Sequence, residues 1–369
     1  MGAAGASVTW DSNVFRLPDS LAGLAPNGRF DRTSAMYAGL RIDKPYAQQR
    51  VLLDATGTAY RHDRFSYLDF DALDYRGAWQ WHVTPRVSGV LSAERSQALV
   101  NYADFRNITQ RNVRTAENRR ASADWLMFGG WHLVGAASHQ EWRTSLPIVD
   151  QGSFRATAAE AGVKYFAPSA NAIGFNLRSL EGRYTDRPLD PVNFLGDGFR
   201  RTETELTASW IATGRSSLDA HLKHIEHREN HFPQRDFSGT AAALGFHWSP
   251  AGRLTLGVDA ARELTPWRDD TATYKADNRL SLGPVWQLSA RVVMKMHVVR
   301  GTSDYRQPLV ALAGPARHDS FRSEQLAIEW GMQRNVSLTA SLQRQRRSSS
   351  AAGLDFSDSI ATLGVSLLF

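Results

Sequence analysis

Four histidines, His221, His224, His227 and His231, form the group in this chain whose spacing comes nearest to a metal site. On a helix, His224, His227 and His231 would share one face, and imidazole is a common zinc ligand. The apolar alternation over 218–222 instead indicates a strand, on which His224 points to the side opposite to His221 and His227. We therefore expect no metal site and no cofactor.

The residues that support nucleophilic catalysis do not form a recognisable motif. The sequence has no cysteine, no Gly-x-Ser-x-Gly elbow and neither a phosphate loop nor a dinucleotide fingerprint. Serine, histidine and acidic residues are numerous enough to meet by chance, so they identify no triad. We expect no catalytic residues and a protein that is not an enzyme.

Charged side chains recur singly along the chain and alternate with apolar ones, which puts them on one face of each predicted strand. An Arg or Lys facing lipid at mid-membrane depth costs about 2–4 kcal/mol, so on membrane-crossing strands this face must line an interior. We predict lumen-lining positions for Arg41, Asp54, Arg76, Lys164, Arg178, Glu205, Lys223, Arg253, Asp259, Arg291, Lys295 and Glu329. These residues carry both signs, so ion pairs that stiffen the wall and contacts with a passing solute are both possible roles.

The elements that would position these residues are β-strands. Apolar and polar residues alternate over 33–44, 49–60, 253–264 and 286–300. Mean hydropathy is −0.38, and no stretch approaches the roughly 18–20 apolar residues that a membrane-spanning helix needs. The pattern excludes a helical membrane protein and allows a barrel that crosses the membrane on strands.

Short turn signals set the predicted number of strands. They lie at 44–46, 84–85, 129–130, 168–169, 213–214, 250–252, 283–284 and 334–335, with longer polar connections between them. Two strands around each turn, with one more at 6–17 and one at 356–369, give an all-β antiparallel barrel of eighteen strands, with sixteen as the alternative. We expect a single domain over 1–369 with both termini at the periplasmic side.

Aromatic residues support a membrane barrel. The chain has 11 Trp, 10 Tyr and 17 Phe, and several stand beside the predicted short turns, as an interfacial girdle would. The last residue, Phe369, ends a strand whose alternate positions Leu363, Val365 and Leu367 are apolar. We interpret this terminal pattern as the signal read by outer-membrane assembly machinery.

The net charge of +6 is scattered over the strands, so we expect no nucleic-acid partner. The start of the sequence lacks the charged and apolar regions of a secretion signal, and we expect an outer-membrane protein from which that signal has been removed. Lipid and lipopolysaccharide are then expected partners. Arg344, Arg346 and Arg347 could meet lipopolysaccharide phosphates or simply belong to a solvated rim.

Residues 8–19 read Val-Thr-Trp-Asp-Ser-Asn-Val-Phe-Arg-Leu-Pro-Asp. This opening resembles that of a family of outer-membrane proteins encoded in exopolysaccharide biosynthesis operons, including exosortase-associated ones. Ser12 departs from the acidic residue common there. The motif residues Trp10, Asn13, Phe15 and Arg16 are expected to organise the first strand and barrel closure, and the resemblance supplies no catalytic residues.

Two functions follow. The resemblance implies a component of exopolysaccharide secretion, a conduit or scaffold that contacts the polymer and works with periplasmic or inner-membrane export proteins. The barrel itself also fits a general diffusion porin, whose lumen is constricted by a long loop folded inward.

Overall fold

The computed structural model of the protein is one closed barrel of eighteen antiparallel strands. It describes residues 1–20, 28–104, 109–146, 153–267, 271–309 and 315–369. Each strand pairs with the next along the chain, and β1 closes the barrel against β18, from Ala3 opposite Leu368 to Asp11 opposite Ile360. The predicted fold class and strand number are confirmed.

The strands have the following bounds. They are β1 (Gly2–Asp11), β2 (Asp31–Tyr46), β3 (Gln49–His62), β4 (Phe70–Thr84), β5 (Val87–Leu99), β6 (Val113–Phe128), β7 (Trp131–Thr144), β8 (Phe154–Phe166), β9 (Ala172–Tyr184), β10 (Gly198–Thr213), β11 (Ser216–Glu229), β12 (Phe237–Ala251), β13 (Leu254–Pro266), β14 (Tyr274–Gln287), β15 (Val292–Arg306), β16 (His318–Gly331), β17 (Val336–Ser349) and β18 (Phe356–Leu368). At 10 to 16 residues, they are long enough to cross a bilayer at a tilt, which takes about 9–11 residues.

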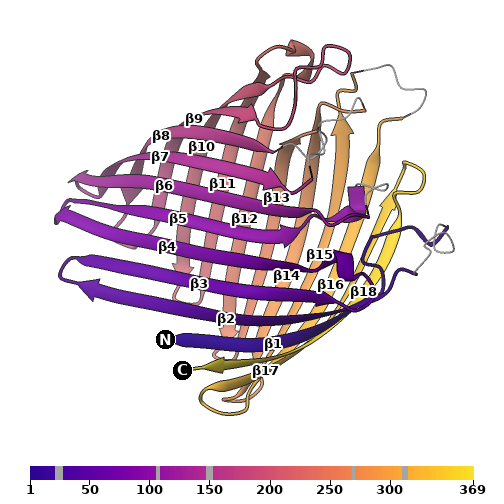
Figure 1. The fold of residues 1–369 in the computed structure, drawn as a ribbon. Coiled ribbons are helices and arrows are strands. Elements are labelled where there is room, and N and C mark those ends of the chain that lie inside the picture. The colour runs from indigo at the N-terminus through magenta and orange to yellow at the C-terminus, as the bar shows by residue number, and fades with distance from the viewer. Residues whose placement is uncertain (21–27, 105–108, 147–152, 268–270, 310–314) are drawn as a thin grey trace.

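The two ends of the barrel differ. Short turns and both termini lie at one end, and the longer connections lie at the other (Figure 1). Within the described residues, the long connections carry the short 3-10 helices η2 (Ser66–Leu68), η3 (Tyr102–Asp104) and η5 (Pro233–Arg235). In the described part of the chain, no helix is long and apolar enough to cross a membrane.

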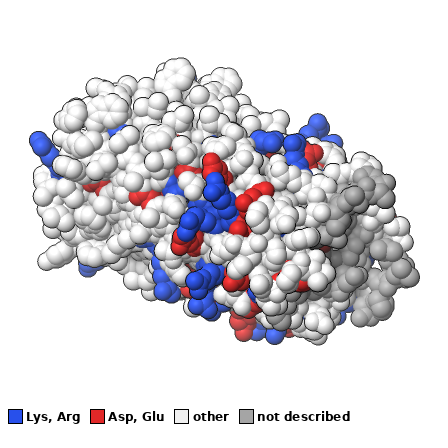
Figure 2. Space-filling model, turned by 90° about the horizontal axis from the view of Figure 1, so that it is seen from above, with Lys and Arg blue, Asp and Glu red and all other residues white. Residues whose placement is uncertain are grey.

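The outer face of the wall is apolar. On β9, for example, Ile173, Phe175 and Leu177 are exposed, whereas Leu180, on the opposite face, is buried. Trp210, Trp248 and Trp330, which the sequence places beside short turns, are also exposed. Charged side chains gather in mixed patches with wide uncharged areas between them (Figure 2). An exposed apolar wall of this kind suits hydrocarbon, not water.

One predicted turn is wrong. Gly283 and Pro284 lie inside β14, and the chain turns at 288–291 instead. Pro284 has no N–H to donate, and the pairing of β14 with β15 is interrupted between Leu282 and Val285. Pairing with β13 continues through the same residues, so the strand survives. The predicted continuous strand over 286–300 is therefore two strands joined by a turn.

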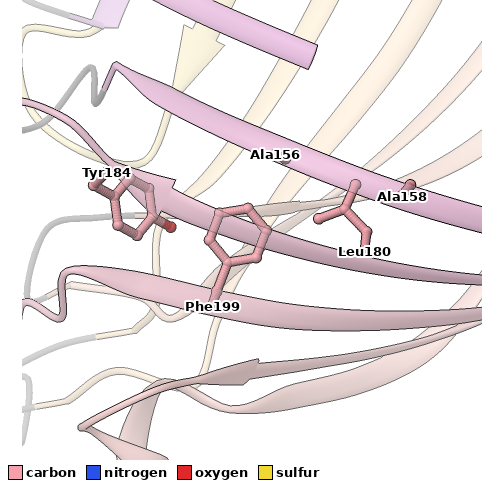
Figure 3. Close-up of a cluster of buried hydrophobic side chains, with 5 residues drawn as sticks. All are labelled: Ala156, Ala158, Leu180, Tyr184 and Phe199. Atoms are coloured by element: carbon pink, nitrogen blue, oxygen red, sulfur yellow. The ribbon is translucent and has the colours of Figure 1, made fainter. Parts of the chain in front are cut away.

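Buried side chains collect near the long-loop end instead of in one central core. Ala156, Ala158 and Leu180 pack with Tyr184 and Phe199 on three adjacent strands, β8 to β10 (Figure 3). The Tyr184 and Phe199 ring centroids are 5.4 Å apart. This cluster lines the inner wall just below the connections, where it helps to shape the lumen.

The motif residues at the start of the chain lie where the barrel closes. The Asn13 side chain donates to the carbonyl oxygens of Leu17 and Ser357, the latter on β18, at 2.7 and 3.0 Å. Arg16, which has a φ of 55°, pairs with Asp358 on β18 at 3.2 Å. The contacts to Ser357 and Asp358 join the segment that follows β1 to β18.

The other two motif residues have different surroundings. Trp10 lies on β1 between Arg32 and Ala361, on the same face as Val8 and Leu363. Phe15 is buried beyond the end of β1, under the connections. At the other terminus, Phe369 exchanges backbone hydrogen bonds with Gly2, so the last residue extends the closure.

Candidate functional site

The barrel interior is the candidate site, and the register shows which predicted residues face it. Ten of the twelve predicted lumen residues lie on the face opposite the exposed apolar side chains. They are Arg41, Asp54, Arg76, Lys164, Arg178, Glu205, Lys223, Asp259, Lys295 and Glu329. Arg253 and Arg291 instead precede β13 and β15 and lie in short turns, because the strands begin one residue later.

A network of ion pairs runs around the inner wall from β6 to β11. Glu160 contacts Arg120 at 2.6 Å and Arg178 at 3.2 Å. Glu203 then contacts Arg178 and Lys223, each at 3.3 Å. These side chains are neighbours because the register puts Glu160, Arg178 and Glu203 directly opposite one another. The network rigidifies the wall and presents alternating charges to the lumen.

The chain segment at the start of the β5–β6 connection crosses to a distant part of the wall. Asp104, the last residue of η3, accepts hydrogen bonds from Arg317, just before β16, at 3.0 Å and from Arg347 of β17 at 2.6 Å. Arg347 also donates to the Ala103 carbonyl. β5 and β6 are separated from β16 and β17 by several intervening strands, so this segment spans part of the opening.

Aromatic packing holds the base of the same segment. Tyr102 lies against Phe15, with ring centroids 5.3 Å apart, and Phe15 lies against Phe65 at 4.9 Å. Leu68 completes this cluster, so three connections meet in it. The Tyr102 hydroxyl donates to the Gln110 carbonyl at 3.0 Å, and burial raises the pKa of Tyr102 to about 12.

A cavity of about 520 Å³ lies between this segment, the wall of β6 to β10 and the ends of β13 and β14. We call it the constriction chamber. Its lining includes five aromatic residues and four cationic ones, Trp142, Phe154, Tyr184, Phe199, Trp267, Arg114, Arg178, Arg201 and Lys275, with Asp104 as the acidic member. A ring-shaped solute would find flat apolar surfaces there, with cations beside them.

Cations and rings also contact each other in and beside the constriction chamber. The Arg114 guanidinium lies 5.3 Å from the Trp142 ring centroid, and the Lys275 ammonium lies 5.7 Å from that of Trp267. Arg317 lies 4.1 Å from the Tyr305 ring centroid and pairs with Asp319 at 2.6 Å. These contacts hold the charged groups in place along the inner wall.

A second cavity, of about 870 Å³, lies against the same wall, closer to the short turns. Lys164, Asn176 and His221 are among its lining residues. Lys164 has no ion pair within the described ranges, whereas His221 contacts Glu205 at 3.3 Å. Both cavities are lined by residues of β6 to β10, at successive positions along these strands.

The histidine group does not converge. His221 and His227 face the interior, whereas His224 lies on the outer face, near Glu226. His231 follows β11 and contacts Asp197 at 3.0 Å. No group of three or more His, Asp or Glu suited to a metal ion occurs among the described residues.

Solved structures share this architecture. OpdK of Pseudomonas aeruginosa, solved with vanillate, has a TM-score of 0.53 at 11% identity, with 99% of this chain and 98% of that one covered. OccK2 (OpdF) of the same organism, solved with glucuronate, has a TM-score of 0.52 at 13% identity, with 99% and 96% covered. Acinetobacter baumannii OccAB3 has a TM-score of 0.52 at 9% identity, with 100% and 99% covered.

No protein-family model matches the sequence, and a search of curated proteins finds no match. The expected association with exopolysaccharide operons therefore rests on the opening motif alone. At these identities the similarity concerns the fold. It agrees with the predicted outer-membrane location: the fold of this chain is that of an eighteen-strand outer-membrane porin.

Proposed function

We propose that this chain is an outer-membrane channel that lets small solutes diffuse through a constricted lumen. The observation that carries the proposal is the pinned segment at η3, which Asp104 ties to Arg317 and Arg347 across the opening. An inward segment of this kind narrows the path without closing the barrel. It fits the porin alternative better than a conduit for a bulky polymer, and so do the structural neighbours.

The solutes that the constriction chamber fits best are small organic anions that contain a ring. Four cationic side chains line it and Asp104 is the one acidic side chain in the lining, although Arg178 and Arg201 pair with Glu203 and Lys275 pairs with Asp277. Five aromatic rings are available for stacking. Two neighbours were solved with vanillate and glucuronate, and both compounds combine a ring with a carboxylate. The fold similarity to these two neighbours supports the proposal that this channel also favours solutes that combine a ring with a carboxylate.

Single-channel recording in planar bilayers tests the proposal. We expect a steady conductance that vanillate or glucuronate interrupts, with vanillyl alcohol and glucose as uncharged controls. Lys275→Gln should weaken this block about fivefold, since one cation near a bound anion is worth about 1 kcal/mol. Lys44→Gln, which makes the same charge change at the end of β2 beside a short turn, should leave the block unchanged. A silent barrel, or block by charged and uncharged solutes alike, would contradict the proposal.

Exopolysaccharide secretion remains the second candidate because the opening motif resembles that family. Asn13 and Arg16 lie at barrel closure, so the motif is compatible with either function. The same recordings distinguish the two. Persistent block by an acidic or neutral polysaccharide, with no effect of small anions, would favour a polymer conduit and its export partners.

A further inference from the structure

Three arginines form a row across the outer face of the barrel. Arg300 of β15 lies directly opposite Arg322 of β16, and Arg322 lies directly opposite Arg346 of β17. All three share the face of the exposed apolar residues Met296, Leu326 and Leu342 on their own strands. The row therefore points toward the surrounding membrane.

This arrangement is unfavourable without an anion. Side chains directly opposite each other in an antiparallel pair have Cβ atoms about 5 Å apart, and like charges at that spacing destabilise the sheet. Arg322 pairs with Glu324 on its own strand. Over the ranges that the structure describes, Arg300 and Arg346 have no ion pair, so the charge of the row is mostly uncompensated.

The row lies at the upper edge of the apolar belt, on the long-loop side. On β15, Met294, Met296 and Val298 precede Arg300 on the outer face, and on β17 Leu342 precedes Arg344 and Arg346. Long connections are extracellular in bacterial outer-membrane barrels, so this edge corresponds to the headgroup level of the outer leaflet.

An apolar groove adjoins the row. It has a volume of about 660 Å³, and Leu244, Ala260 and Leu280 contribute to its lining. Leu244, Ala260, Leu280 and Arg300 lie opposite one another in turn from β12 to β15, so the groove leads along the same register into the arginine row. Arg262 also lines its edge.

We propose that the outer face of β13 to β17 binds a phosphorylated glycolipid of the outer leaflet, of the lipid A type. The arginine row takes a phosphate, since guanidinium groups bind phosphate bidentately, and the groove takes an acyl chain. Charge complementarity supports this occupant: the outward charged residues next to the belt are the five cations Arg262, Arg300, Arg322, Arg344 and Arg346 and the one acid Glu324. Asp304 lies farther out on β15, where it pairs with Arg306 and His318. The inference is independent of what passes through the lumen.

The test measures lipid binding to the refolded barrel in detergent by native mass spectrometry. We expect one diphosphoryl lipid A per barrel. The triple variant R300Q/R322Q/R346Q should bind about a hundredfold more weakly, since each cation at a charged membrane surface contributes about 1 kcal/mol. R228Q removes an outward arginine of β11 that pairs with Glu226 at 3.5 Å, and it should bind like the wild type.

Folding of each variant is checked by its heat-dependent gel migration. If the triple variant does not fold, each single variant should bind the lipid about fivefold more weakly than the wild type. Ala260→Phe, which fills the groove without removing a charge, should also reduce binding. Equal binding of dephosphorylated lipid A, competition by inorganic phosphate at the same concentration, or unchanged binding by the triple variant would overturn the proposal. So would pairing of two barrels through this face in place of lipid.

Discussion

At the scale of single residues, Asp104 determines how firmly the inward segment is held. Its carboxylate bridges Arg317 and Arg347, and both guanidinium groups are largely buried. Hydrogen bonds to charged groups contribute about 1.5–3 kcal/mol each, so Asp104→Asn should destabilise the docked segment by about 2–3 kcal/mol. We expect larger and more variable single-channel conductance.

Asp19→Asn is the matched control for this substitution. It removes the same charge from an exposed pair with Arg29 at 2.9 Å, which contributes little. Its conductance should equal that of the wild type. If Asp104→Asn also conducts like the wild type, the segment does not form the constriction.

The pH at which Tyr102 ionises shows whether the same segment is docked. Burial raises its pKa from 10.0 to about 12, because the phenolate is disfavoured in the aromatic cluster. The neutral phenol therefore stabilises docking fully below pH 10, and this contribution is lost as the pH rises from 10 to about 12. Subtracting the alkaline absorbance titration of Tyr102→Phe from that of the wild type should reveal a phenol that ionises near pH 12. Ionisation of this phenol near pH 10 would mean that Tyr102 is not buried in solution.

Sequence reasoning placed charged residues on the inner face of the strands but did not identify the contacts that hold the inward segment. Alternation fixes the face of Arg178 or Glu205, because side chains on a strand alternate strictly. Asp104 contacts partners 213 and 243 positions away, and no local pattern encodes such a pairing. Trp267 and Lys275 were missed for the same reason.

At the scale of elements, closure of the barrel depends on a close approach at β1. A Cβ at Gly5 would collide with the Tyr37 ring of β2 and the Val365 carbonyl of β18. Gly5→Val should therefore disturb the pairing of β1 on both sides and lower the yield of folded barrel. Its neighbour Ala6 lies opposite Met36 and Val365 on the apolar face, so Ala6→Val should fold normally.

The measurement is heat-dependent gel migration after refolding, which separates the closed barrel from the unfolded chain. Equal yields of the two valine variants would show that β1 tolerates bulk on its inner face. The sequence predicted that β1 closes against β18, but it could not predict this contact, because the position of the Tyr37 ring depends on the three-strand register.

The wrong turn at Gly283 and Pro284 has a similar cause. Both residues favour turns, and local reading cannot detect that β13 continues to pair with them. The true turn at 288–291 is instead stabilised by the Ser289 hydroxyl, which accepts from the backbone N–H groups of Arg291 and Val292 at 3.2 and 3.1 Å. Serine supports such turns more weakly than glycine or proline, so it gave the weaker signal.

At the scale of the whole molecule, the strand number followed from the sequence despite the misplaced turn. The error moved one boundary by a few residues and left the count of turns unchanged. The inward folding of loops, the constriction chamber and the outer arginine row depend instead on how distant strands are placed around the closed barrel. These features needed three-dimensional structure.

The barrel has apolar side chains on its outer face and polar side chains on its inner face, which gives a prediction for two neighbouring positions on β16. Leu326 faces outward in the apolar belt, whereas Gln325 faces inward between His297 and Gln343. An arginine facing lipid near mid-membrane costs about 2–4 kcal/mol, but one facing an aqueous lumen costs little. Leu326→Arg should therefore lower the free energy of unfolding in lipid vesicles by that amount, and Gln325→Arg should change it by less than about 1 kcal/mol. Equal losses would mean that the two faces share one environment, whereas a larger loss at Gln325 would place the lipid on the opposite face and reverse the lumen assignment of every strand.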